Sequence, residues 1–337
     1  MGHANNTSGG YHRYVKHIAS DTIRQSNQLN NGTIPSRTFK KVQWYMVEAL
    51  IMGEMLARLA DQPVTRRNRE SLVYLGAIMA LFDAVVDDFR LDKITLNRIL
   101  ENTFSDSVRI VSQKETAIEK VFYLYLDKLT GTIEKEYWKE ISGHLNIIKL
   151  QIGSDEQYGK DISEESVTRI TLGKGGVSAF ICSVFLKQKS DSFRSAVFEM
   201  GGLIQMMNDC QDIYKDTVAG IKTFVHFRND FGDIFNRLDE QRRKTFNLII
   251  ELDLLERRKH ETIFDLNAMF IVIAYKLQRY ADACNYCLDF NTISNMDRKY
   301  FRINPFSPGA IAACYGRIMQ FDFKRCQATP DFKFDKS

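Results

Sequence analysis

The distribution of proline is the feature that most restricts the fold of this chain. Only five prolines occur, and all of them lie in loop-like segments or at the ends of apolar periodic stretches. Because proline breaks the interior of a helix, long stretches without it can stay helical. From Phe39 onward, apolar residues recur with helical spacing, and the alternating pattern of strands is nearly absent. The sequence therefore predicts an all-α protein. The predicted helices cover residues 38–60, 68–90, 94–103, 113–129, 132–152, 162–187, 190–218, 229–255, 258–290 and 307–325.

Length and composition are compatible with one large helical domain or with two smaller ones. The chain has 337 residues, of which 44% are hydrophobic and 26% are charged, as is usual for globular proteins. The uninterrupted helical pattern favours a single domain over residues 36–326. Residues 1–35, with "NNTSGG" and "NQLNNGTIP", are expected to form a flexible N-terminal arm, and residues 327–337 a C-terminal tail.

Charge, cysteine content and hydropathy exclude several classes of protein. The net charge is only +4 and no basic run occurs, so nucleic acid is not an expected partner. The six cysteines form no regular framework, and the single CxxC pair, Cys284 and Cys287, lies in a predicted helix without nearby histidines, which argues against zinc. Free thiols fit a cytoplasmic location. The most apolar stretch, residues 71–86, is too short to cross a bilayer, so no transmembrane segment is expected.

Two acidic stretches interrupt this apolar pattern. In "NDCQDIYKD", residues 208–216, Asn208, Asp212 and Asp216 follow one another at intervals of four, which places them on one face of a helix. Asp209 is an additional acid in this stretch, and either a spare ligand or a solvated neighbour. Like charges on one face repel, so the pattern needs a positive partner.

The other acidic stretch is "FDAVVDDFRLD", residues 82–92. Asp83 and Asp87 are four apart, and Asp88 is adjacent to Asp87. Both stretches follow apolar helical segments, and neither contains a histidine or a glutamate. Helical bundles build metal sites from inward carboxylates, and oxygen ligands favour Mg²⁺, with Mn²⁺ as a substitute. Two such stretches across a cavity would hold a diphosphate through Mg²⁺.

Both stretches resemble motifs of the class I isoprenoid synthases. "DAVVDD" is similar to the D-x-x-x-D-D motif of squalene and phytoene synthases, and "QMMNDCQDIYKD" to their Q-x-x-N-x-x-x-D-x-x-x-D motif. The second stretch also resembles the N-D-x-x-S-x-x-x-E motif of terpene cyclases, with Asp212 in place of serine and Asp216 in place of glutamate. The resemblance implies a single-domain helical bundle around a central apolar pocket. It also implies a prenyl diphosphate substrate and three Mg²⁺ ions.

The resemblance assigns roles to the residues that match the motifs. Its metal ligands would be Asp83, Asp87, Asp88, Asn208, Asp212 and Asp216. Lysines near the second stretch and an Arg-Tyr pair resemble diphosphate-binding groups of the family, although lysines at these positions could equally be solvated. These diphosphate-binding candidates are Lys174, Lys215, Lys222, Arg279 and Tyr280. Phe82 and Phe180 are candidates for the wall of the pocket and are otherwise ordinary core residues.

The segment "RITLGKGGVSAF", residues 169–180, admits two interpretations. Its glycines are either places where two helices pack closely or a helix break whose carbonyl groups face the pocket. In the second case Arg169, four residues before Gly173, resembles the diphosphate-sensing arginine of cyclases, and both residues join Asp83 and Asp87 as catalytic candidates. Aligned on these glycines, Val167 takes the place of the catalytic tyrosine of squalene synthases, which counts against head-to-head condensation.

Three functions are compatible with these patterns. The preferred one is a terpene synthase, a lyase that ionises a linear prenyl diphosphate and cyclises or quenches the cation. The alternative is a prenyltransferase, either of the squalene-synthase type or chain-elongating, although the D-D-x-x-D pattern of the elongating enzymes is absent. The third is a catalytically silent helical protein, which the intact carboxylates argue against. Each allows a homodimer.

Overall fold

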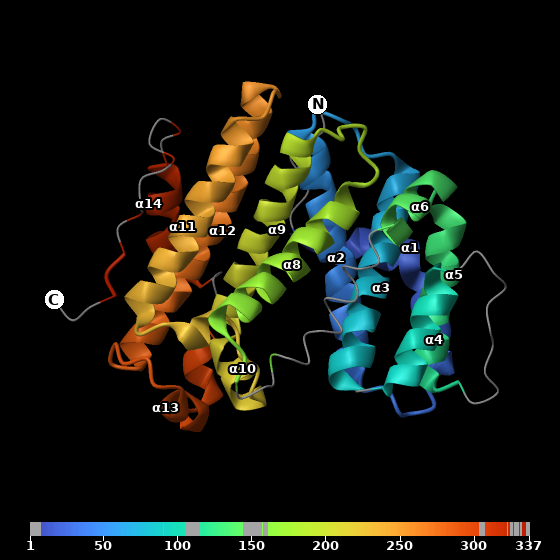
Figure 1. Ribbon diagram of the computed structural model, residues 1–337, viewed down its shortest axis with the longest axis horizontal. Coiled ribbons are helices and arrows are strands. Elements are labelled where there is room, and N and C mark those ends of the chain that lie inside the picture. Colours follow the sequence, from blue (N-terminus) through green and yellow to red (C-terminus); the bar gives the residue numbers. More distant parts are fainter. Residues whose placement is uncertain are drawn as a thin grey trace. The chain divides into compact units, whose positions relative to one another are not determined.

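A computed structural model of the chain describes residues 8–89, 91–104, 115–143, 157, 161–302, 307–321, 323, 326, 330 and 332–334. Every regular element in this part of the chain is helical, so the all-α class is confirmed. The α-helices are α1 (Ser8–Leu29), α2 (Ser36–Leu59), α3 (Arg66–Asp83), α4 (Lys93–Phe104), α5 (Ala117–Thr132), α6 (Lys135–Gly143), α8 (Glu164–Ser183), α9 (Asp191–Gln211), α10 (Ile213–Ala219), α11 (Phe231–Ile250), α12 (Glu256–Ala283), α13 (Phe290–Asn295) and α14 (Pro308–Met319) (Figure 1). The short elements are the π-helical turn η1 (Ala84–Asp88) and the 3₁₀ turns η3 (Phe224–Phe227) and η4 (Arg298–Phe301).

The chain divides into two compact units. Unit 1 comprises Met1–Ala57, Gln62–Ile148 and Cys182–Lys187. Unit 2 comprises Arg58–Asp61, Lys149–Ile181 and Gln188–Ser337. The single domain expected over residues 36–326 stays a prediction.

Unit 1 is built around α3, which packs against α5 and α1. The middle of α3 is buried on nearly all sides, as expected for the most apolar stretch of the sequence. Thr65 caps its N-terminus by accepting a hydrogen bond from the backbone N–H of Asn68. In α5, Thr116 and Glu119 form a reciprocal capping box. Each cap satisfies backbone donors that the first helical turn leaves free, and is worth about 1 kcal/mol.

The N-terminal segment is not the flexible arm that its Asn- and Gly-rich composition suggests. Residues Ser8–Leu29 form α1, which buries Val15, Ala19, Thr22 and Ser26 on one face. This spacing of four, three and four residues is helical, but only two of these side chains are apolar. The weak apolar signal is the reason why the helix is hard to recognise in the sequence.

Unit 2 contains α9, α11, α12 and α14. Helix α11 packs against both α9 and α12, and α12 also packs against α14 (Figure 1). Their facing side chains form one apolar core, which includes Phe235, Phe270 and Tyr280. The residues expected as a C-terminal tail partly join this core, because the rings of Phe332 and Phe334 lie 5.8 and 4.9 Å from the ring of Phe235.

A fully buried arginine, Arg242 of α11, ties the C-terminal segment to this core. Its guanidinium pairs with Asp239 at 2.7 Å and lies 5.0 Å from the ring of Phe270. It also donates a hydrogen bond of 2.9 Å to the carbonyl oxygen of Cys326. A buried charge is tolerated only when it is paired and its donors are satisfied, so Arg242 depends on the segment around Cys326.

Among the described residues, no helix is both long enough and apolar enough to span a membrane.

Candidate functional site

The second acidic stretch lies at the junction of α9 and α10 in unit 2. Helix α9 ends at Gln211, and α10 starts at Ile213. The hydrogen bonds nevertheless continue, since the N–H of Asp212 donates to the Asn208 carbonyl at 3.0 Å and the N–H of Asp216 donates to the Asp212 carbonyl at 2.8 Å. The backbone therefore keeps a helical spacing between the three residues. The ligand role of these residues stays a prediction.

Burial and crowding disfavour the charged form of Asp216. Asn208 is exposed and Asp212 is half-buried, whereas Asp216 is only 7% exposed. Burial, followed by the negative charges of Asp209 and Asp212, raises the pKa of Asp216 to about 8. A cation bound at this position would relieve both effects, because an opposite charge favours the ionised carboxyl. The oxygen-rich set of donors therefore fits a hard cation such as Mg²⁺.

Asp209 is a structural residue rather than a solvated neighbour. Its carboxylate accepts hydrogen bonds of 3.0 Å from Thr171 of α8 and from Gln205 of α9. Burial raises its pKa to about 6. Each of its oxygens accepts one of these hydrogen bonds within unit 2, and the predicted ligand set of this stretch stays Asn208, Asp212 and Asp216.

Helix α8 is continuous, so of the two interpretations of its glycines the helix break near Gly173 is wrong and close packing is correct. Residues Glu164–Ser183 form one helix, and Gly175 and Gly176 pack closely against α9. A Cβ atom built on Gly175 would lie 2.1 Å from the carbonyl oxygen of Gly201. An unbroken helix has no free carbonyl groups in its middle, and therefore cannot direct them at a ligand.

The structure places Arg169 on the exposed surface of α8, one turn before Gly173. Lys174, also on α8, is half-buried, and its positive charge counteracts the raised pKa of Asp209 and of Asp216. It therefore lies close to the second acidic stretch. Val167 is fully buried, as an ordinary core residue of this helix.

Two lysines lie at the second stretch, Lys215 within it and Lys276 on α12. The ammonium group of Lys215 lies 2.9 Å from a carboxylate oxygen of Asp212. Lys276 of α12, which the sequence analysis did not single out, donates to the side chain of Gln211 at 2.5 Å. Burial lowers its pKa, and the charge of Asp212 opposes that shift. A single lysine on a long helix gives no signal in the sequence, so only the fold reveals its proximity to Asp212.

The two residues of the predicted Arg-Tyr pair lie in different environments, one buried and the other on the surface. Tyr280 is buried, and its hydroxyl lies 3.1 Å from the carbonyl oxygen of Phe301 and 3.4 Å from that of Gln211. Arg279 is exposed and pairs with Asp282 at 3.2 Å. Tyr280 thus supports the end of α9 from below the second stretch, whereas Arg279 is engaged on the surface.

Lys222 lies in the loop that follows α10, and its backbone is fixed. Its N–H donates to the carbonyl oxygen of Gln157 at 2.9 Å, and the side-chain amide of Gln157 donates back to the Lys222 carbonyl at 3.0 Å. Gly220, with a φ of +70°, ends α10 in the left-handed conformation and starts this loop.

A half-buried histidine joins the same loop to α10. The Nδ1 atom of His226 accepts the N–H of Thr223 at 3.1 Å, and Nε2 lies 3.2 Å from the Thr217 hydroxyl. Thr217 in turn donates to the Ile213 carbonyl at 2.7 Å. Because Nδ1 is an acceptor, the neutral ring carries its proton on Nε2. Burial, helped by the charge of Lys222, lowers the pKa of His226 to about 4.

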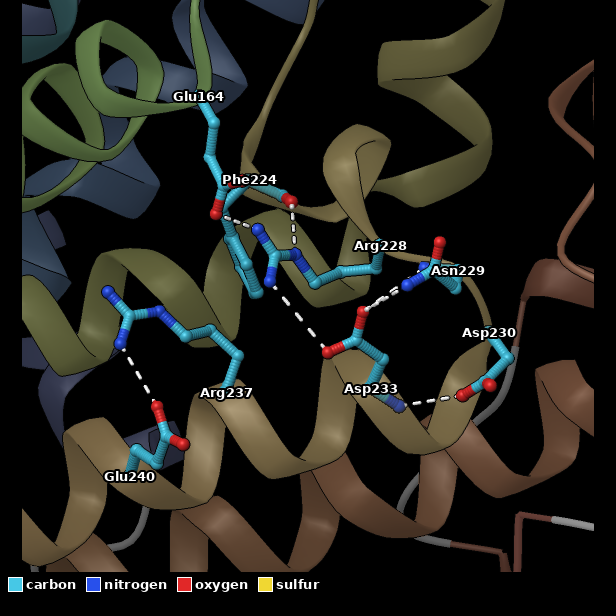
Figure 2. A network of polar contacts seen from close by, with 8 residues as sticks. All are labelled: Glu164, Phe224, Arg228, Asn229, Asp230, Asp233, Arg237 and Glu240. Atoms are coloured by element: carbon cyan, nitrogen blue, oxygen red, sulfur yellow. Dashed lines mark hydrogen bonds and ion pairs between the residues drawn. The ribbon is translucent and has the colours of Figure 1, made fainter.

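Arg228 completes the attachment of this loop, as Figure 2 shows. Its guanidinium forms an ion pair with Glu164 at the start of α8 and lies 3.7 Å from a carboxylate oxygen of Asp233 in α11. Its Nε donates to the Phe224 carbonyl at 3.4 Å. The loop from Gly220 to Arg228 is therefore held at both ends. The sequence contains no motif for these contacts.

The first acidic stretch lies at the end of α3 in unit 1. Asp83 is the last residue of α3, and Ala84–Asp88 form the π-helical turn η1. Lys41 of α2 lies 2.5 Å from an oxygen of Asp83 and 3.7 Å from an oxygen of Asp88. In a π-helical turn the residues five apart are the neighbours, which is why one lysine reaches both aspartates. The side chain of Asp87 lies outside the described part of the chain.

The predicted pocket residues are both buried within their own units. Phe82 is 5% exposed, with its ring 6.5 Å from that of Phe122 in unit 1. Phe180 is 9% exposed, and the guanidinium of Arg194 lies 5.9 Å from its ring in unit 2. Their predicted role in a pocket wall stays a prediction, as does the single metal site shared by the two stretches, because these lie in different units.

The described residues contain no group of three or more His, Cys, Asp or Glu side chains arranged to hold a metal.

A shallow surface hollow in unit 2 lies near the start of α12, at the opposite end of this helix from Lys276 and Tyr280. It is lined by Arg58, Arg257, His260, Glu261, Phe264, Asp265 and Phe323. Its charged groups pair with one another, as Arg58 does with Asp265 and Arg257 with Glu261.

Comparison with known proteins gives only distant similarity. No family model matches the chain, and no curated protein matches it in sequence. Among solved structures, it is similar to a geranyltransferase from Legionella pneumophila, with 14% identity and a TM-score of 0.39 over 80% of this chain and 99% of that one. It is also similar to geranylgeranyl pyrophosphate synthetases from the archaeon Geoglobus acetivorans (13% identity, TM-score 0.35, 91% of this chain and 99% of that one) and from Pyrococcus horikoshii Ot3 (12%, 0.36, 93% and 99%). Such TM-scores are too low to assign an activity.

Proposed function

We propose that this chain is a Mg²⁺-dependent enzyme that acts on a prenyl diphosphate and transfers the prenyl group to a second prenyl substrate. The observation that carries the proposal is the set of acidic and basic side chains at the end of α9. Asp212 and Asp216 keep helical spacing there, and Lys174 and Lys215 lie close enough to act on their charges. A diphosphate needs both kinds of group, one to bind its metal ions and the other to bind its oxygens.

In this proposal the acidic groups of both stretches bind the metal ions. Asn208, Asp212 and Asp216 would hold Mg²⁺ from one side, and Asp83 with Asp87 or Asp88 from the other. When bound, Mg²⁺ neutralises the charge that develops on the diphosphate as the C–O bond breaks.

The basic groups of the chain would bind the diphosphate itself. Lys174, Lys215 and Lys222 would bind its oxygens. Gln157 and His226 would keep the Lys222 loop in place before the substrate arrives, which lowers the ordering cost of binding.

Transfer is preferred to cyclisation because α8 is continuous. The cyclase interpretation needs a helix break at Gly173 with Arg169 one turn before it, and Glu164–Ser183 form one unbroken helix. Head-to-head condensation lacks its tyrosine, since Val167 takes that position. Chain elongation is the remaining type of transfer, although the first stretch reads D-x-x-x-D-D rather than D-D-x-x-D.

Product analysis tests this proposal directly. The full chain is incubated with Mg²⁺ and linear prenyl diphosphates of increasing length, each alone and together with a short homoallylic diphosphate. We expect products lengthened by the homoallylic unit, and only when both substrates are present. Terpene products with the carbon count of a single substrate would instead establish a cyclase, and twice that count a head-to-head enzyme. Diphosphate binding without any product would leave only the binding protein.

A further inference from the structure

The CxxC pair does not lie inside a helix, as the sequence suggests, but in a sharp turn at the end of α12. Helix α12 stops at Ala283, and the turn comprises Cys284, Asn285, Tyr286 and Cys287. The N–H of Tyr286 donates to the Ala281 carbonyl at 2.7 Å, and the N–H of Cys287 donates to the Cys284 carbonyl at 3.0 Å. The last bond closes a four-residue turn.

The backbone of this turn is unusual. Asn285 and Tyr286 have φ angles of 55° and 63°, which is the sign required at both central positions of a type I′ turn. Asparagine tolerates this conformation, whereas a bulky residue such as tyrosine rarely adopts it. Strained backbone persists where surrounding contacts determine it, and it often marks a functional position.

Contacts outside the turn hold Tyr286 in place. Its hydroxyl donates to a carboxylate oxygen of Asp282 at 2.6 Å, and its ring packs against the core of unit 2. The strained conformation therefore exists while both thiols are reduced, and no rearrangement is needed to produce it.

The turn brings the two cysteines within reach of each other. A four-residue turn places its first and last Cα atoms less than about 7 Å apart, and disulfides span about 4.4–6.8 Å between Cα atoms. Both cysteines are free thiols. The charge that Cys287 would carry also contributes to the raised pKa of the Cys284 thiol, which is a consequence of their proximity.

The two thiols differ in accessibility. Cys287 is exposed, whereas Cys284 is buried with its sulfur 3.8 Å from that of Met296. Burial is the main cause that raises the pKa of Cys284 to about 11, so this thiol is the less reactive of the two. An oxidant from solution therefore meets Cys287 first.

We propose that Cys284 and Cys287 form a redox modification site, at which a low-molecular-weight disulfide converts the two thiols into an intramolecular disulfide. The Cys287 thiolate attacks a sulfur of the small disulfide, releases one small thiol and forms a mixed disulfide. The Cys284 thiol then loses its proton to solvent, attacks the Cys287 sulfur and releases the second small thiol. The protein loses two protons and two electrons, and the small disulfide takes them up as two thiols.

Mass spectrometry of the full chain tests this proposal. After equilibration with oxidised glutathione, we expect the intact mass to fall by two hydrogens and the linked peptide to contain residues 284–287, with complete reversal by dithiothreitol. The Cys287→Ser variant should show no such loss, and it should fold because residue 287 is exposed. The matched control is Cys314→Ser, which removes another cysteine of unit 2 and should leave the oxidation unchanged.

A second pair of variants tests the role of the turn. Asn285→Pro fixes φ near −65° and opposes the turn, whereas Asn285→Gly allows a positive φ. We expect the equilibrium constant for oxidation by glutathione to fall by about tenfold or more in the proline variant. The glycine variant should stay within about threefold of the unchanged protein. A stable glutathione adduct on Cys287, a disulfide to any other cysteine, or equal constants in the two variants would overturn the proposal.

Discussion

Asp209 and Asp216 lie in the same acidic stretch but have different surroundings. The carboxylate of Asp209 accepts hydrogen bonds from Thr171 of α8 and Gln205 of α9, so it contributes to the contact between these two helices. Asp216 is nearly as buried, with a pKa raised to about 8 by burial and neighbouring negative charge. Helical spacing separates Asp209 from the face of Asn208 and Asp212. It does not tell which face meets α8, so the sequence left the role of Asp209 open.

We predict that the single residue His226 makes the stability of the folded protein sensitive to acid. Its pKa is about 4 in the folded protein and about 6.5 when unfolded, so the unfolded state binds the extra proton more strongly between these values. The free energy of unfolding that depends on a neutral His226 is therefore fully present above pH 6.5 and is lost as the pH falls towards 4. The loss is expected to be on the order of 1–2 kcal/mol, discounted because the ring is only half-buried.

Thermal unfolding of variants between pH 4 and pH 7 checks this prediction. His226→Gln has no imidazole to protonate, so the gap between its melting temperature and that of the unchanged protein should narrow as the pH falls. The matched control is His260→Gln, an exposed histidine of the same unit, which should retain the acid sensitivity. If His226→Gln loses stability between pH 6.5 and pH 4 as steeply as the unchanged protein does, His226 is not the cause.

Among the elements, α8 and α9 form the contact on which the second acidic stretch depends. The regular apolar spacing of α8 predicts this helix within a few residues, but the sequence leaves open whether its glycines mark close packing or a helix break. Gly175 and Gly201 allow the two backbones to approach, with each glycine facing the carbonyl of the other. A glycine in a helical pattern is compatible with a break or with close packing. Only the neighbouring helix, distant in the sequence, decides between them.

The sequence pattern also failed to predict helix α1 and placed the end of α12 too late, for related physical reasons. Helix α1 has few apolar residues on its buried face, so its pattern looks like that of a loose arm. Helix α12 ends at Ala283, before the predicted end at residue 290, because Asn285 and Tyr286 adopt left-handed conformations. No proline or glycine lies at this point of the sequence to indicate that the helix ends. Contacts such as Lys41 with Asp83 join residues far apart in the chain and leave no local pattern.

We predict that Gly175→Ala destabilises the protein by about 2–4 kcal/mol, because the new methyl group overlaps a backbone oxygen that cannot move alone. Chemical denaturation, followed by helical circular dichroism, measures this change. The matched control is Gly316→Ala in α14, where nothing lies within 4 Å of the added Cβ. It should be neutral or stabilise by up to about 1 kcal/mol, because alanine favours helix. Equal effects of the two substitutions would contradict the close packing of α8 and α9.

For the whole molecule, the central question is whether the two acidic stretches serve one ligand. They belong to different units, and each has its own lysine contact, from Lys41 of α2 to Asp83 in the first stretch and from Lys215 to Asp212 within the second. The motifs predict one Mg²⁺–diphosphate cluster held by both. This prediction depends on energetic coupling, which can be measured without any assumption about geometry.

We expect the effects of Asp83→Asn and Asp216→Asn on Mg²⁺-dependent diphosphate binding to be strongly non-additive. Each single substitution should weaken binding by about tenfold or more, and the double substitution should add little, because the cluster is already disrupted. Calorimetry at fixed Mg²⁺ gives the three dissociation constants. The control pair combines Asp216→Asn with Asp127→Asn on the exposed face of α5, where the second change should have no effect. Effects that simply multiply would mean that the stretches bind independently.

The buried Arg242 also imposes an order of events during biosynthesis. Its guanidinium pairs with Asp239 only three residues away, but its hydrogen bond to Cys326 spans 84 residues. Translation adds roughly 5–20 residues per second, so several seconds separate the synthesis of Arg242 from that of its distant acceptor. During that interval α11 cannot bury its arginine with every donor satisfied. Unit 2 is therefore expected to reach its final packing only after the segment around Cys326 has left the ribosome, whereas most of unit 1 is complete long before.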